Sequence, residues 1–307
     1  MTQTVTFGIS DVTPYVNWIY FFHAWGVAPR FAAVARLHDC PGCRAAWLTA
    51  QPDGDRSQAE AAAALYDDAV RMLARFSADF HTYGRVGLYP AWSDGDDLVL
   101  RLEDGSCFAI PCLRQQRVAR EGEPYLCLAD YLPPVGYGED RLGVFATAVD
   151  AGMEHLYDSD DYSRMLAQTL CDRLAEATAE LLHRDVRRRY WGYAPDEDLP
   201  LDDLLAGRFQ GIRPAVGYPS LPDQSMVFLL DRVLHLGDIG ITLTESGAMR
   251  PHASTCGLMF SHPAARYFAV GPIDRRQFED YARRRGMEPA ALRRFLQANY
   301  SPSTDDL

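Results

Sequence analysis

The sequence contains no lysine, and all 30 of its basic residues are arginine. No lysine Schiff base can form, which excludes pyridoxal-phosphate and lysine-aldolase chemistry. The Walker A lysine and the strand lysine of protein kinases are also missing, so the familiar phosphoryl-transfer sites are excluded. The arginine side chain is a fixed, bidentate donor that recognises carboxylates, and its exclusive use points to binding more than to covalent chemistry.

An excess of positive charge is lacking as well. The 307 residues include 42 acidic side chains, which leaves a formal net charge of −12. Affinity for a phosphate backbone needs a positive face, so we expect no nucleic-acid partner. The longest apolar stretch, residues 226–236, is interrupted by Asp231 and Arg232. It falls well short of the roughly 20 residues that a membrane span requires, so we expect no membrane partner.

A secretory signal is absent from residues 1–11, which have neither a basic nor an apolar segment. We therefore expect a cytoplasmic protein whose seven cysteines are mostly reduced. The segment His38-x-Cys40-Pro-Gly-Cys43 invites a metal or redox interpretation. Zinc needs four ligands, however, and no second CxxC or paired histidine follows at a suitable spacing. We interpret the segment as a plain turn and expect no metal site, while the role of the two cysteines stays open.

Hydrophobic patterning predicts an α+β protein. Apolar residues recur at helical spacing over 59–79 and 161–190, with shorter helices near the C-terminus. Short apolar segments split by Asp-Gly turns are typical of antiparallel strands. The expected strands are 85–92, 98–102, 107–111, 240–245, 254–261 and 266–273. An aromatic arm at about residues 1–30 is expected to pack on the body, and we expect a single domain over 1–307.

Three carboxylates, Asp172, Glu176 and Glu180, recur at every fourth residue of the predicted long helix. They therefore share one ridge, where like charges are mildly destabilising. A solvated helix face is the commoner explanation of such a ridge, and a binding role is the alternative.

The most specific stretch of the sequence is residues 210–222, where two prolines and a glycine bracket Arg213 and Tyr218 within eight residues. Such a rigid turn either holds a ligand group or only makes a corner, and composition alone does not decide between the two.

Four stretches together resemble the activation domain of cobalamin-dependent methionine synthase. They are IRPAVGYPSLPD, ITLTESGAM, FSHP followed by RYFAV, and YWGYAPDEDL. Further similarity, from YVNWIYFFHAW near the N-terminus to residues 280–287, extends over nearly the whole chain. The resemblance implies a C-shaped α+β domain around a twisted antiparallel sheet flanked by long helices.

The function that this resemblance implies is binding of S-adenosylmethionine for the reactivation of methionine synthase. Members of the family dock on a cobalamin-carrying domain or subunit and support reductive methylation of cob(II)alamin, with an electron from a flavodoxin-like reductant. The ligand is positioned by the domain, whereas cobalamin supplies the nucleophile. Without this partner, the chain is expected to catalyse no reaction.

The resemblance also assigns the S-adenosylmethionine site. Arg213 matches the arginine that holds the methionyl carboxylate, a charge-assisted contact. Gly217 and Tyr218 complete the same RxxxGYP turn, and Tyr267 and Phe268 match two adjacent aromatic residues that serve the adenosyl part.

The same comparison gives the acidic ridge a possible role. Asp172 and Glu176 match carboxylates that receive the histidine displaced from the partner's cobalamin.

Departures from the family pattern concern the methionyl end of the site. Asn17 stands where the family has aspartate, Gly207 where it has glutamate, and Arg250 and His252 replace a tryptophan and a glycine. These changes leave open a second hypothesis: a non-catalytic docking protein that kept the fold and lost S-adenosylmethionine binding. The start at Met1 favours a free-standing subunit that acts on a separate partner.

Overall fold

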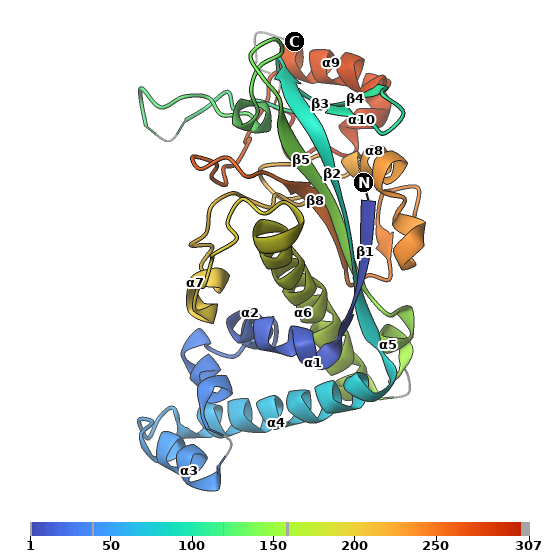
Figure 1. The fold of residues 1–307 in the computed structure, drawn as a ribbon. Helices are drawn as coiled ribbons and strands as arrows, with labels where there is room; N and C mark the ends of the chain where they lie inside the picture. The colour runs from blue at the N-terminus through green and yellow to red at the C-terminus, as the bar shows by residue number, and fades with distance from the viewer. Residues whose placement is uncertain (1, 39, 119, 158–159, 302–307) are drawn as a thin grey trace.

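The computed structural model describes residues 2–38, 40–118, 120–157 and 160–301 (Figure 1). Within this part of the chain, six strands form an antiparallel sheet. Five of them have the order β4-β3-β2-β5-β8, and the sixth, β1, pairs with the N-terminal half of β2. A two-stranded ribbon, β6-β7, lies apart from it. The strands are β1 (Thr2–Gly8), β2 (His81–Asp94), β3 (Asp97–Arg101), β4 (Cys107–Pro111), β5 (Asp140–Val149), β6 (Thr242–Leu243), β7 (Met249–Arg250) and β8 (Ser254–Met259).

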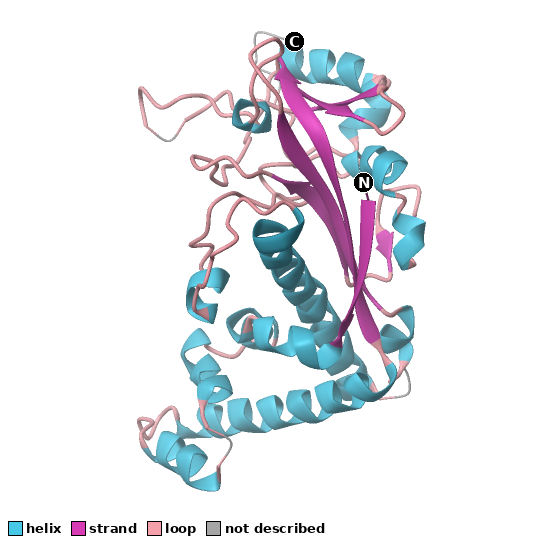
Figure 2. Cartoon of the chain, in the orientation of Figure 1, coloured by secondary structure: helices cyan, strands magenta, loops and turns pink. Residues whose placement is uncertain are grey.

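Helices surround the sheet and extend away from it, as Figure 2 shows. The longest are α6, which packs on β5, β2 and β8, and α4, which runs across the bottom of the molecule in Figure 1 with α3 at its far end. The helices are α1 (Ile9–Val12), α2 (Trp18–Ala24), α3 (Pro41–Thr49), α4 (Arg56–Asp79), α5 (Ala151–His155), α6 (Asp161–Asp185), α7 (Leu201–Leu205), α8 (Met226–Leu234), α9 (Arg275–Arg285) and α10 (Pro289–Arg293).

Strand β5 divides the hydrophobic core into two parts. Successive side chains of a strand point to opposite faces. Leu142, Val144 and Ala146 accordingly join one buried cluster, which includes residues of α8, while Phe145 and Val149 join the other, which includes residues of α6. Because both faces of the strand are covered, its burial is continuous, and β5 holds α6 and α8 on opposite sides of the sheet.

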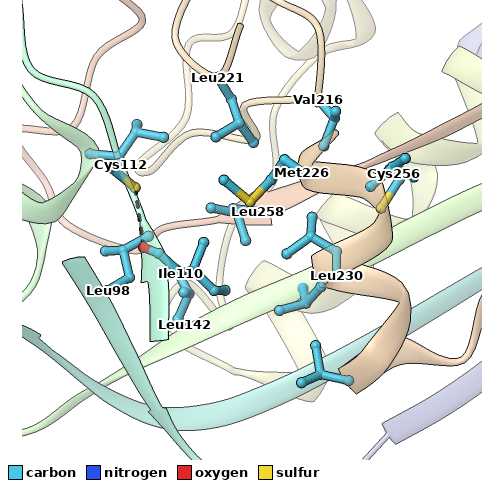
Figure 3. Packing of buried hydrophobic residues seen from close by; sticks show 14 of the residues in the cluster. Leu98, Ile110, Cys112, Leu142, Val216, Leu221, Met226, Leu230, Cys256 and Leu258 are labelled. Carbon is cyan, nitrogen blue, oxygen red and sulfur yellow. Dashed lines mark hydrogen bonds between the residues drawn. The ribbon is translucent and has the colours of Figure 1, made fainter. Parts of the chain in front are cut away.

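Figure 3 shows the first of these clusters from close by. Met226 and Leu230 of α8 lie beside Leu258 of β8, and Leu98 and Ile110 close the cluster from β3 and β4. All five side chains are fully buried. Burial of each large apolar side chain stabilises the fold by about 1.5–3 kcal/mol. The cluster therefore fixes α8 against β8, and with them the segments of chain that follow each of them.

Several sequence-based expectations are confirmed. The Asp94-Gly95 turn joins β2 to β3, with Asp94 opposite Asp97 and a φ of 59° at Gly95. Strand β4 has the predicted bounds, and the long helix begins at residue 161 as expected.

Other expectations were wrong. Residues 266–273 form no strand, because the amide of Val270 donates to the carbonyl of Pro219 and not to a sheet neighbour. The strand expected at 240–245 is reduced to the two residues of β6. The helix expected over 161–190 does reach residue 190, but its last turn, Val186–Tyr190, is π-helical. The aromatic arm begins with strand β1, which the sequence analysis did not anticipate.

Candidate functional site

Residues 212–216 run along the outer edge of β8 and place Arg213 beside α6. Isolated antiparallel bridges join Ile212 to Phe260 and Ala215 to Gly257. A Cβ atom on Gly257 would lie 2.2 Å from the carbonyl oxygen of Pro214. Glycine is therefore required at this point of β8 for the two backbones to approach so closely.

The turn that follows this segment is held by its own backbone. Gly217 has a φ of 85°, and its amide donates to the carbonyl of Leu221 at 2.9 Å. The amide of Leu221 in turn donates to the carbonyl of Tyr218 at 2.8 Å. A Cβ on Gly217 would meet the Oε1 of Gln224 at 2.6 Å, so both conformation and space favour glycine. The turn fixes the direction of the Tyr218 side chain.

Arg213 is held from two sides. Its guanidinium forms an ion pair with Glu180 of α6, and its backbone amide donates to the hydroxyl of Tyr267 at 2.9 Å. Burial by itself lowers the pKa of Arg213, but Glu180, Tyr267 and Glu176 together outweigh this effect and raise the pKa. The arginine therefore stays charged in a site where only 10% of its side chain is exposed.

Tyr218 contacts the next carboxylate of the same ridge. Its hydroxyl donates to the Oε1 of Glu176 at 3.2 Å. The negative charge of Glu176 and partial burial both raise the pKa of Tyr218, so the phenol remains protonated and able to donate. Two adjacent positions of one helix ridge, Glu176 and Glu180, are thus joined to two residues of the 213–218 segment.

A cavity of about 810 Å³ lies between these groups, α2 and the 267–269 segment. We call it the main cavity because the predicted ligand residues line it, although an adjoining cavity that shares Asn17 and Leu205 is slightly larger, at about 880 Å³. The volume of the main cavity is in the range of small-molecule sites. Its walls combine acidic, basic and aromatic side chains. They are formed by Tyr15, Asn17, Tyr20, Arg173, Glu176, Ala177, Glu180, Leu205, Arg213, Pro214, Ala215, Tyr218, Pro219, Ser220, Tyr267, Phe268 and Ala269.

The structure brings most of the sequence-predicted ligand residues together. Asn17, Arg213, Tyr218, Tyr267 and Phe268 all line the main cavity, although they come from three distant parts of the chain. Gly217 does not line it and serves the turn instead.

Two of the departures noted in the sequence have local structural explanations. Asn17 is the N-cap of α2, and its side-chain oxygen accepts the amide of Ile19 at 3.1 Å. Gly207, with a φ of 68°, follows the end of α7 and donates to the carbonyl of Leu204. A left-handed residue at this point favours glycine on conformational grounds.

Asp172 lies apart from the main cavity, although it shares the ridge with Glu176. Its carboxylate faces His252, with 3.3 Å between Oδ1 and Nδ1. Burial raises the pKa of Asp172, while the neighbouring His252 and Arg173 oppose the rise. The two carboxylates expected to act together thus have different neighbours.

Several residues of the cavity wall were not singled out as ligand residues from the sequence. Glu180 was recognised only as part of the acidic ridge, and its ion pair with Arg213 depends on the fold. Ser220 links the two halves of the site, because its Oγ donates to the carbonyl of Phe268 and accepts the amide of Phe268. The aromatic density around Tyr15 and Tyr20 was the available signal for the wall contributed by the N-terminal arm.

Close to Arg213, the end of α6 and the π-helical turn that follows it carry a fully buried histidine and a fully buried arginine. Arg187 forms a bidentate ion pair with Glu197, at 2.6 and 2.8 Å, and stacks on Phe209. His183 contacts the edge of the same ring, with 5.0 Å between ring centroids. Burial, reinforced by the charges of Arg187 and Arg213, lowers the pKa of His183 well below its ordinary value.

An antiparallel sheet with one long helix across its face, and a cavity of small-molecule size beside that helix, defines an α+β domain with a candidate ligand site. More specifically, the chain belongs to the family described as vitamin B12 dependent methionine synthase, activation domain, which its residues 8–286 match. Among the described residues, none of the helices has both the length and the apolar character needed to cross a membrane.

A similar solved structure is that of the MetH reactivation domain bound to AdoHcy. It is 36% identical to this chain, superposes with a TM-score of 0.85, and the match covers 98% of this chain and 90% of that one. The expected fold, a C-shaped α+β domain built on an antiparallel sheet, is thereby confirmed (Figure 1).

Proposed function

We propose that this chain binds S-adenosylmethionine in the main cavity and presents it to a cobalamin-carrying methionine synthase domain or subunit. The observation that carries the proposal is the gathering of Asn17, Arg213, Tyr218, Tyr267 and Phe268 around one cavity. The similarity to a domain solved with AdoHcy supports it, because AdoHcy is S-adenosylmethionine after loss of its methyl group.

The charges of the cavity fit this ligand. S-adenosylmethionine has a carboxylate, an ammonium and a sulfonium, so it needs one basic and at least one acidic neighbour. Arg213 offers the basic group, and Glu176 and Glu180 offer carboxylates to the cationic part. Tyr267 and Phe268 supply aromatic surface for the adenine. Carboxylates are therefore available in this cavity even though Asn17 and Gly207 replace acidic residues of the family.

Binding requires that Arg213 be shared. In the structure its guanidinium already contacts Glu180, and a planar guanidinium has five N–H donors. The ligand carboxylate would take donors that Glu180 leaves free, while Glu180 turns its charge toward the ligand ammonium. The chain thus acts by binding and orienting its ligand.

When bound, S-adenosylmethionine supplies an electrophilic methyl group on sulfur. The proposed reaction on the partner consumes one electron and this methyl group, converts cob(II)alamin to methylcobalamin and releases AdoHcy. The electron comes from a flavodoxin-like reductant. This chain's contribution is proximity and orientation, which are worth several kcal/mol when two reactants are held in place.

One observation favours a second candidate, a docking protein that no longer binds S-adenosylmethionine. Arg213 is neutralised by Glu180, and the oxygen of Asn17 is engaged as a helix cap. Both groups would then serve the fold alone.

A reconstituted assay separates the two candidates. The partner, loaded with cob(II)alamin, is mixed with reductant and methyl-labelled S-adenosylmethionine, with and without this chain. We expect label in methylcobalamin only when the chain is present. Complex formation without label transfer would support the docking protein and overturn the proposed function.

A further inference from the structure

The corner between the 3-10 helix Pro29–Arg36 and α3 contains a cluster of metal-ligating side chains that has no part in the main cavity. Cys40 is the N-cap residue of α3, Pro41 is its first helical residue, and the amide of Cys43 donates to the Sγ of Cys40 at 3.1 Å. An amide donated to a cysteine sulfur across a CxxC turn stabilises the thiolate form. The helix start therefore places both thiols on one side of the turn.

His38 completes the cluster. Its ring nitrogen and the sulfurs of Cys40 and Cys43 all lie within 4.8 Å of one another. In a tetrahedral zinc site with ligands at roughly 2.0–2.3 Å, donor atoms are roughly 3.5 Å apart. Rotation of the exposed His38 side chain and of the half-buried cysteine side chains can bring the three donor atoms to the shorter spacing of a zinc site. The sequence already points to these three residues and favours a turn because a fourth ligand is missing; the structure adds that their ligand atoms lie close together.

Little else stabilises this corner. Helix α3 buries none of its residues among those described. It is attached to α4 through the ion pair of Arg44 with Asp67, at 2.6 Å, and to the preceding 3-10 helix through Trp47, whose ring meets Phe31 edge to face. The apolar contacts of this corner are made by partly buried side chains, Leu37, Trp47 and Leu48, and a metal ion would add a cross-link between the two segments.

We propose that His38, Cys40 and Cys43 bind one divalent cation of the zinc class, with the fourth coordination position left to water. Two thiolates and one imidazole form a soft to borderline donor set, which favours zinc over calcium or magnesium. The site lies outside the main cavity and does not depend on the function proposed for that cavity.

Cobalt(II) titration of the full, reduced chain tests the proposal, because thiolate ligation gives Co²⁺ an intense near-ultraviolet charge-transfer band. We expect a single equivalent to bind with this band and to be displaced by Zn²⁺. Cys40→Ser and Cys43→Ser should each weaken binding by about 100-fold or more, since even outer-shell changes cost about 10–100-fold. His38→Ala should weaken it by about tenfold and shift the visible bands. Cys107→Ser, which removes an exposed cysteine elsewhere, is the matched control and should change nothing.

Thiol accessibility gives a second readout. Saturation with Zn²⁺ should protect two thiols from alkylation in the wild type and in Cys107→Ser, but not in Cys40→Ser or Cys43→Ser. Absence of the charge-transfer band, or its persistence in both cysteine variants, would overturn the proposal. So would closure of a Cys40–Cys43 disulfide in air at saturating Zn²⁺, which would assign the pair to redox chemistry.

Discussion

At the scale of single residues, the main cavity is a set of charges that already satisfy one another. Arg213 is paired with Glu180, and Tyr218 donates to Glu176. Removing one partner of a buried ion pair leaves an uncompensated charge and is strongly destabilising. The ion pair therefore holds the two side chains in position when no ligand is bound. A ligand with one positive and one negative group can replace the contact between them with two equivalent ion pairs.

Asn17→Asp tests the methionyl end of the site. Aspartate is as good an N-cap as asparagine, so α2 should keep its start. The new carboxylate lies on the cavity wall, where it would add a counter-charge for the ligand ammonium. We expect calorimetry to show S-adenosylmethionine binding about tenfold tighter at low salt, with a gain that shrinks as salt rises. Unchanged or weaker affinity would place the ammonium elsewhere.

At the scale of elements, the site depends on the 212–216 segment extending the sheet beyond β8. Gly257 permits this contact, since any side chain there would collide with the carbonyl of Pro214. The edge of the sheet thus places Arg213 opposite the ridge of α6.

Gly257→Ala should separate the segment from β8. Overpacking at such a site costs about 1–3 kcal/mol of folding stability, and displacement of Arg213 should weaken S-adenosylmethionine binding as well. Urea unfolding and calorimetry measure the two effects. Gly237→Ala is the matched control, because a Cβ there meets nothing within 4 Å. Equal effects of the two substitutions would show that close backbone approach at Gly257 is unimportant.

Helix α6 presents two carboxylates with different tasks. Glu176 lines the main cavity, whereas Asp172 faces His252. We predict that Glu176→Gln weakens S-adenosylmethionine binding, while Asp172→Asn leaves that affinity nearly unchanged and slows reductive methylation in the reconstituted assay. The physical reason is that Asp172 can offer its charge to an imidazole of the partner. Full activity of Asp172→Asn in this assay would show that Asp172 has no role in the reaction and serves the structure alone.

The sequence predicted those parts of the fold that have local signals. The Asp94-Gly95 turn, the apolar stripe of α4 and the start of α6 are of this kind. Strand β5 escaped notice because it is buried on both faces and lacks the alternation of a half-exposed strand. Segment 266–273 has the composition of a strand but pairs with the 219–220 turn. The Arg213–Glu180 pair joins residues 33 positions apart, so only the fold reveals it.

At the scale of the whole molecule, the chain forms a C-shape (Figure 1). Parts of it that are distant in sequence, the N-terminal arm, α6, Leu205 and the segments 213–220 and 267–269, line one cavity. The C-terminal part of helix α6 contains the fully buried His183, and the π-helical turn that follows it contains the fully buried Arg187. Among the described residues, neither ring nitrogen of His183 has a hydrogen-bond partner. The uncharged histidine therefore packs like an apolar side chain at neutral pH, whereas its protonation in acid would destabilise the fold.

This burial predicts acid sensitivity. The pKa of His183 is lowered in the folded state, so below about pH 6.5 the unfolded chain binds a proton that the folded chain does not, and stability falls by about 1.4 kcal/mol per pH unit. His183→Leu removes this group without leaving a polar partner unsatisfied. Urea unfolding at pH 7 and 5.5 should show a loss that is about 1 kcal/mol smaller in the variant. Identical losses in both proteins would contradict the assignment.

The central claim, that the main cavity binds S-adenosylmethionine through Arg213, is tested most directly by calorimetric titration of the chain and of Arg213→Ala. We predict a single site in the wild type and a loss of about 2–4 kcal/mol, or about 30- to 1,000-fold in affinity, in the variant. Arg208→Ala, which removes an exposed arginine paired with Asp203, should bind like the wild type. No binding to the folded wild-type chain, or equal binding to Arg213→Ala, would contradict the account.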